Sequence, residues 1–235
     1  MNCIKFAAAA AFCICAGTFV FAQSQSVSSG SKSDTSVESE YFASLQDSII
    51  TTLATSDDYD QKLVALQYLE DAVANGRSSA EMTAALVGLA GEGTITQSRQ
   101  GKRIVNNFPD IRARACDLLG EAGDESATNT LITIAKDDRE PMVQSAAIRA
   151  MANVAGAEKS QEAVEAIAWI QKRNAALNPT SSLAFEVLAA YEKLADNVED
   201  RASMLQSISA IASDYRYVTP VRTKALDLLK ALNAR

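Results

Sequence analysis

The sequence contains no histidine, and it holds only 10 glycines and 4 prolines among 235 residues. Histidine is the commonest general base and a common metal ligand, so its absence rules out a Ser-His-Asp triad and argues against catalysis. Scarce glycine and proline argue against a turn-rich β protein. We therefore expect a protein that is not an enzyme and that uses neither a metal nor a cofactor.

Aromatic residues are also scarce, at 6%, although 48% of the chain is hydrophobic. The core must then be built from Ala, Leu, Ile and Val, which suits closely packed helices. The net charge is −7. Because phosphate backbones repel an acidic protein, nucleic acid is not expected as a partner.

The first 22 residues carry the pattern of a secretory signal peptide. Lys5 is their only charge, the stretch 6–20 is apolar, and Val20-Phe21-Ala22 places small residues at −3 and −1 of a cut before Gln23. The alternative is an uncleaved membrane anchor, since about 20 apolar residues span a bilayer. No later segment is long and apolar enough to cross a membrane.

Cysteine usage fits export without disulfides. Cys3, Cys13 and Cys15 lie in the predicted signal peptide, so only Cys116 would remain and no intramolecular bridge could form. Cys116 flanks a helical apolar stripe, and we expect it to be a buried structural thiol. A lipid anchor through Cys15 is not expected, because the residues before it lack the small side chain that such sites require.

Residues 23–37 are rich in serine and predict a linker. Helical patterning then extends over residues 38–235. In its first helix one apolar face is predicted, made of Phe42, Leu45, Ile49, Ile50 and Leu53.

One apolar pattern recurs along the rest of the chain, each time just after a proline. An apolar residue is followed by others at +4, +7, +8 and +11, which is one face of a helix, and proline is tolerated only near a first turn. The four copies follow Pro109, Pro141, Pro179 and Pro220 and begin at Ile111, Val143, Leu183 and Val221. A degenerate copy begins at Gln61. The chain therefore predicts a tandem array of helical repeats.

Each of these helices except the last is followed by a second one with its own template, beginning near Met82, Ala127, Ala163 and Met204. Short turns such as Gly123-Asp124-Glu125 join the two helices of a pair. The spacing to Ile111 is too long for one pair, and the excess lies in residues 91–107. We expect this segment to be an insertion loop.

The run from Ile111 through Arg112, Leu118-Leu119-Gly120 and Gly123-Asp124 to the restart at Pro141-Met142-Val143 resembles a HEAT repeat. It is most similar to the short HEAT-like repeats also found in phycobilisome lyases. The resemblance is strong over residues 109–156, weaker to residue 232 and poor over residues 38–93. It implies an all-α fold, an α-solenoid of about four to five stacked antiparallel helix pairs, whose second helices line the concave face.

Three features are candidate binding elements: the insertion, Trp169 and Phe185. The insertion carries Arg99, Lys102 and Arg103 with few acidic residues, so it is either a grip for an acidic partner or a solvated loop. Arg112 and Arg114 flank the next apolar stripe and would extend this basic patch.

The second candidate element is Trp169. It lies well off its helix's apolar stripe and should reach an edge or the surface, either as an aromatic anchor or packed on the neighbouring repeat. Phe185 points nearly opposite Leu183 and Ala190 on its helix, so it either reaches a partner or contacts the adjacent helix pair.

These features predict a non-catalytic, exported protein that binds another protein as an adaptor or scaffold, in a bacterial cell in the periplasm or on the envelope. Two alternatives stay open. One is an accessory subunit or regulator of an envelope enzyme, as resemblance to the lyase-type repeats implies. The other is a structural envelope protein that associates with itself through its end repeats.

Overall fold

The computed structural model describes residues 37–234. The predicted signal peptide, residues 1–22, lies outside the described residues, as does the predicted linker except for Val37. The first helix begins at Val37, one residue before the predicted start of the repeat region.

Ten α-helices make up most of the described chain, in good agreement with the predicted pattern. Their bounds are α1 Val37–Ala54, α2 Tyr59–Ala74, α3 Ala80–Ala90, α4 Pro109–Ala122, α5 Thr128–Asp137, α6 Pro141–Val154, α7 Ala157–Leu177, α8 Ser181–Leu194, α9 Ala202–Ser213 and α10 Thr219–Asn233. A single 3-10 turn, η1 (Glu125–Ala127), precedes α5, and two short strands, β1 (Arg99–Gln100) and β2 (Arg103–Ile104), lie between α3 and α4.

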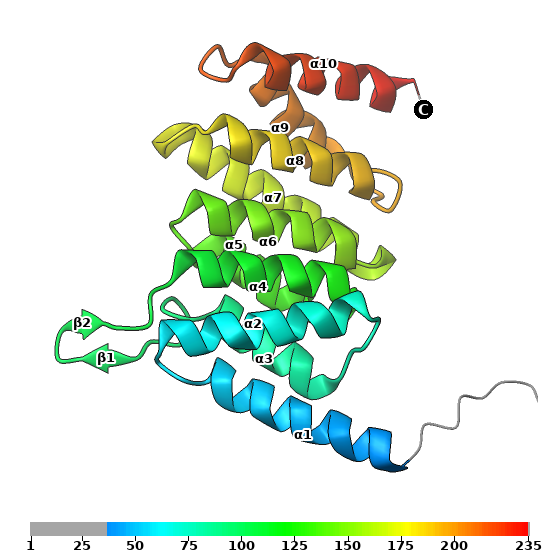
Figure 1. The fold of residues 1–235 in the computed structure, drawn as a ribbon. Helices are drawn as coiled ribbons and strands as arrows, with labels where there is room; N and C mark the ends of the chain where they lie inside the picture. Colours follow the sequence, from blue (N-terminus) through cyan, green and yellow to red (C-terminus); the bar gives the residue numbers. More distant parts are fainter. Residues whose placement is uncertain (1–36, 235) are drawn as a thin grey trace, which may run out of the picture. The chain divides into compact units, whose positions relative to one another are not determined.

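The helices stack in two layers (Figure 1). The first helices of the repeats, α2, α4, α6, α8 and α10, follow one another in one layer, and the second helices, α3, α5, α7 and α9, form the other. The prediction of an all-α solenoid of helix pairs is confirmed. Over residues 37–234 it has four complete pairs, with α1 packed on α2 and α3 at one end and α10 unpaired at the other.

The pairing of helices in space is shifted by one helix from their pairing in the sequence. Each second helix packs more closely on the first helix of the next repeat than on the first helix of its own. Thus α3 packs mainly on α4, α5 on α6, and α9 on α10.

Prolines mark the starts of the first helices as the sequence predicts. Pro109 and Pro141 are the first residues of α4 and α6, and Pro220 is the second residue of α10, where a missing N–H costs nothing. Pro179 lies just outside α8, before the capping position Thr180. At the other end of α4, Gly123 takes a left-handed conformation with φ 71°, which glycine adopts without strain and which stops the helix.

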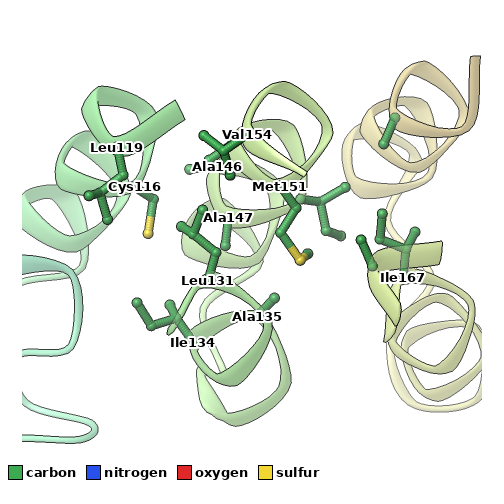
Figure 2. Close-up of a cluster of buried hydrophobic side chains, with 14 of the residues drawn as sticks. Cys116, Leu119, Leu131, Ile134, Ala135, Ala146, Ala147, Met151, Val154 and Ile167 are labelled. Carbon is green, nitrogen blue, oxygen red and sulfur yellow. The ribbon is translucent and has the colours of Figure 1, made fainter. Parts of the chain in front are cut away.

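Aliphatic side chains fill the space between the layers without a break. Figure 2 shows Cys116 and Leu119 of α4 beside Ala147 of α6, with Met151 continuing toward Ile167 of α7. Such a core needs close helix contact, and Gly120 supplies it. A Cβ at this position would lie 2.7 Å from the Cα of Ala150 on α6.

The first helix differs from its prediction. Of the apolar face predicted there, Ile50 is buried and Leu53 packs partly against the core. The side chains of Phe42, Leu45 and Ile49 are exposed. Helical spacing groups these residues correctly but cannot show that the array meets α1 on the side of Ile50 and Ala54.

Among the described residues, no helix combines the length and the apolar character that a membrane crossing requires.

Candidate interaction surfaces

The predicted insertion is an ordered hairpin that projects sideways from the stack (Figure 1). β1 and β2 pair antiparallel, with Arg99 opposite Ile104 and Gln100 opposite Arg103. Asn106 holds the base of the hairpin and is buried there. Its side chain accepts a hydrogen bond from the Ser98 amide (2.9 Å) and donates one to the Thr96 carbonyl (3.0 Å). The insertion is therefore fixed at its base and free at its tip.

A buried ion pair ties the start of the insertion to the array. The Lys62 ammonium on α2 lies 2.6 Å from a carboxylate oxygen of Glu92, and both side chains are more than 90% buried. Lys62 also donates to the carbonyl of Ala54, the last residue of α1 (3.1 Å). Burial raises the pKa of the Glu92 carboxyl, and the neighbouring Lys62 opposes that rise.

Sequence reasoning missed this pair. Lys62 directly follows the degenerate slot at Gln61, and Glu92 lies in a segment read only as a loop. The signal available was an acidic residue in an otherwise basic insertion.

The basic side chains at the hairpin tip are exposed, as predicted. Arg99 donates to the side-chain oxygen of Gln97 (2.6 Å). The side chains of Lys102 and Arg103 make no hydrogen bond or ion pair with any residue in the range 37–234. The tip therefore presents two positive charges that are not neutralised by the described part of the chain.

Arg112 does not extend this basic surface, so that part of the prediction is wrong. Its side chain is 2% exposed and pairs with Asp138, Nε lying 2.7 Å from Oδ2. It also donates to the side chain of Asn107 (2.7 Å). The edge of α4 that carries Arg112 meets the end of α5, where Asp138 follows the last helical residue. The arginine therefore holds two helices together and is not available to a partner.

Arg114 lies at the surface but is already paired. It binds the carboxylate of Glu70 on α2 through two nitrogens. Its side chain is 39% exposed. Its charge is balanced within the array, so it adds little to the positive field of the hairpin tip. Of the five predicted basic residues, the structure thus brings together Arg99, Lys102 and Arg103 and assigns Arg112 and Arg114 to contacts between helices.

Trp169 forms a second candidate surface. It lies on α7, in the layer of second helices. Its ring is 49% exposed, and the Arg173 guanidinium lies 4.6 Å from the ring centre. The ring lines a groove of about 350 Å³ between α7 and α9. Tyr217 also lines this groove and is almost fully buried, and its hydroxyl oxygen accepts a hydrogen bond from Gln171 (2.8 Å). This position fits the prediction that Trp169 reaches an edge or the surface, and its role as an aromatic anchor stays a prediction.

Two further side chains singled out by their helical positions have contacts of their own. Phe185, on α8, is covered in part by Lys224 of α10, whose ammonium lies 4.9 Å from the ring centre. Cys116 is fully buried, and burial raises the pKa of its thiol well above the usual range. A thiol in that state is neither accessible nor ionised, which fits the predicted structural role.

Comparison with known proteins finds one family model that matches part of the chain. Residues 102–178 match the family model of HEAT repeats, a span that runs from the hairpin tip to the end of α7. The match is to HEAT repeats in general and does not single out the phycobilisome-lyase type. No curated protein and no solved structure matches the chain.

Proposed function

We propose, starting from the premise that this chain carries HEAT repeats, that it is a non-catalytic scaffold or adaptor that binds a protein partner. HEAT repeats are protein-interaction modules, because stacked helix pairs offer extended surfaces without needing a catalytic pocket. The absence of histidine from the sequence supports a role without chemistry of its own.

The observation that carries this proposal is the β1–β2 hairpin. A rigid base positions Lys102 and Arg103 away from the stack, and neither is neutralised within residues 37–234. Such charges attract an acidic surface and raise the rate of association more than they raise affinity. We therefore assign the hairpin tip to an acidic patch on the partner protein.

We also propose that this scaffold acts after export from the cytoplasm. The apolar residues 6–20 and the small residues at the predicted cut before Gln23 support secretion, and hence a periplasmic or envelope setting in a bacterial cell. A cell-fractionation experiment that finds the protein in the cytoplasm would contradict this part of the proposal.

The binding part is tested by pull-down from envelope extract. The wild-type chain should recover a protein that the double variant Lys102→Glu/Arg103→Glu loses or retains at least ten-fold less, and recovery should fall as salt is raised. The matched control is Arg139→Glu/Lys230→Glu, which makes the same charge change at exposed positions outside the hairpin. Equal recovery by both double variants would show that the hairpin is not part of the interface. No recovery by the wild type would count against the proposed scaffold role itself.

A further inference from the structure

The outer side of α1 carries an apolar stripe that the array leaves uncovered. Tyr41 is 62% exposed, Phe42 67%, Leu45 43% and Ile49 54%, whereas only Ile50 and Ala54 of this helix are buried. At about 100° per residue, Tyr41 lies opposite Ile50, and the four exposed side chains fall on one side over two turns. The helix thus has two apolar sides, a buried one at Ile50 and Ala54 and an exposed one that is turned away from the array.

The opposite end of the array is built differently. The outward side of α10 carries Thr223, Asp227 and Lys230 around one exposed leucine, Leu226. The end repeats of a solenoid require polar outer faces if the protein is to stay soluble and monomeric. α10 meets that requirement and α1 does not, so α1 is built as an interface and not as a cap.

Once the predicted signal peptide is removed, the segment that remains before α1 has little with which to cover this stripe. In the sequence between Gln23 and Ser36, Val27 is the only large apolar residue. A segment of that composition has little apolar surface to exchange for the water that covers Phe42 and Leu45. For the chain without its predicted signal peptide, we therefore infer that the cover comes from another molecule.

The charge pattern of α1 indicates which molecule. Every exposed side chain from Tyr41 to Thr52 is uncharged, and the helix contains no lysine or arginine. A strongly charged partner would gain no salt bridge on this stripe and would pay for desolvation. The surface that matches a neutral apolar stripe is a second neutral apolar stripe.

We propose that α1 is a dimerisation helix that packs antiparallel on α1 of a second copy of this chain, about a two-fold axis at Leu45. This arrangement places Tyr41 opposite Ile49 of the second copy, and Glu38 opposite Thr52 of the second copy. A parallel pairing would instead bring the acidic first turns, with Glu38 and Glu40, against each other. Two-fold contacts of one patch with itself are the commonest form of homodimer.

The expected dimer is weak. A helix of 18 residues is about 27 Å long, and one helix pair buries less than the roughly 800 Å² per partner of a standard interface. The dissociation constant of the dimer should therefore be on the order of micromolar. Joining two scaffolds in this way would present two hairpins at once and strengthen binding to a repetitive partner.

Sedimentation velocity of the full chain from about 1 to 100 micromolar tests this proposal. The wild type should shift from monomer to dimer, and Phe42→Glu/Leu45→Glu should remain a monomer. At concentrations where the wild type is also monomeric, the two should share one melting temperature, because both side chains are exposed in the monomer. Leu226→Glu is the matched control at the other end and should still dimerise. A wild type that is monomeric throughout, or one that grows into open-ended chains sensitive to Leu226→Glu, overturns the proposal.

Disulfide trapping gives the orientation. Cys116 is buried, so an introduced cysteine would be the only accessible thiol in residues 37–234. Cys3, Cys13 and Cys15 lie in the predicted signal peptide, and the protein used for this test lacks that segment. Mixing Tyr41→Cys with Ile49→Cys under mild oxidation should give mainly the mixed dimer. Each variant alone should cross-link poorly. Preferential cross-linking of Tyr41→Cys to itself would establish parallel helices and refute the two-fold arrangement described above.

Discussion

At the scale of single residues, the buried charges of this protein hold separate elements together. Lys62 pairs with Glu92 at the base of the insertion, and Arg112 pairs with Asp138 at the end of α5. An ion pair of this kind contributes little net stability compared with an apolar pair, but losing one partner leaves the other charge buried and uncompensated.

Replacing Arg112 with methionine should therefore lower the free energy of unfolding by about 3–5 kcal/mol, because Asp138 stays buried without its partner. The matched control is Arg149→Met, which removes an arginine whose side chain is 42% exposed beside Asp117 and Glu186. An exposed pair is worth about 0–1 kcal/mol. Urea denaturation measures both, and equal losses would show that Arg112 is not held as described.

The buried apolar stripe of α4 gives a second contrast. Leu118 is 3% exposed, so Leu118→Ala should lower the free energy of unfolding by about 2–5 kcal/mol through the cavity it leaves. The hairpin variant Lys102→Glu/Arg103→Glu should have a free energy of unfolding within about 0.5 kcal/mol of that of the wild type, because it changes only exposed side chains. Thermal unfolding of the two proteins checks the assignment, which fails if they melt alike.

At the scale of elements, the most extensive packing between two helices within residues 37–234 is that of α4 on α6, where Gly120 lies. Glycine normally weakens a helix interior by about 0.5–1 kcal/mol relative to alanine. At this position that cost is offset by the close approach of Ala150, whose Cα leaves no room for a side chain.

Gly120→Ala should destabilise the protein, since its Cβ would lie 2.7 Å from the Ala150 Cα and the two helices would have to separate. The effect expected from such overpacking is about 1–3 kcal/mol. Gly88→Ala on α3 is the control, because its Cβ would meet nothing within 4 Å. That variant should gain up to about 1 kcal/mol from helix propensity. Chemical denaturation should give changes of opposite sign, and changes of the same sign would contradict the packing described here.

Much of this element-level picture could be predicted from the sequence. Apolar spacing and the prolines indicated all ten helices, because both depend only on local chemistry. The partner of Arg112 could not be found in this way, since Asp138 lies 26 residues away and only the fold brings them together. The same holds for α1, where periodicity defines an apolar side without showing which neighbours it meets. Lys102 and Arg103 could be singled out because they lie in an insertion that breaks the period.

At the scale of the whole molecule, no helix pair is self-sufficient. A stripe of five apolar side chains gains about 1.5–3 kcal/mol per side chain, and ordering each backbone residue costs about 1–2 kcal/mol. Stacking buries both sides of every internal pair. The array should therefore respond to solution conditions mainly as one unit.

Its response to pH should be flat near neutrality and steep in acid. No histidine is present to titrate between pH 6 and 8. Hydrogen bonds from Ser126 lower the pKa of Asp124, and those from Arg216 lower the pKa of Asp214. A lowered pKa contributes stability that is present above the unfolded value and is lost as pH falls through the folded value.

Melting temperatures should thus be nearly constant from pH 8 to 6 and should decline below about pH 4. Asp124→Asn should start from a lower value at pH 7 and lose less on acidification than the wild type. Calorimetry across this range measures the difference, and identical acid slopes would show that Asp124 has no part in it.

The offset between the two layers bears on how such an array can change its length. Because α5 rests mainly on α6 and α3 mainly on α4, a second helix keeps more of its packing when it is moved together with the first helix that follows it than with the one before it. Duplication or grafting should therefore succeed when the cut falls inside a sequence repeat, in a turn such as Gly123-Asp124, and should fail when it falls between repeats. The modules that could be exchanged among proteins of this kind are then out of phase with the motif by which they are recognised.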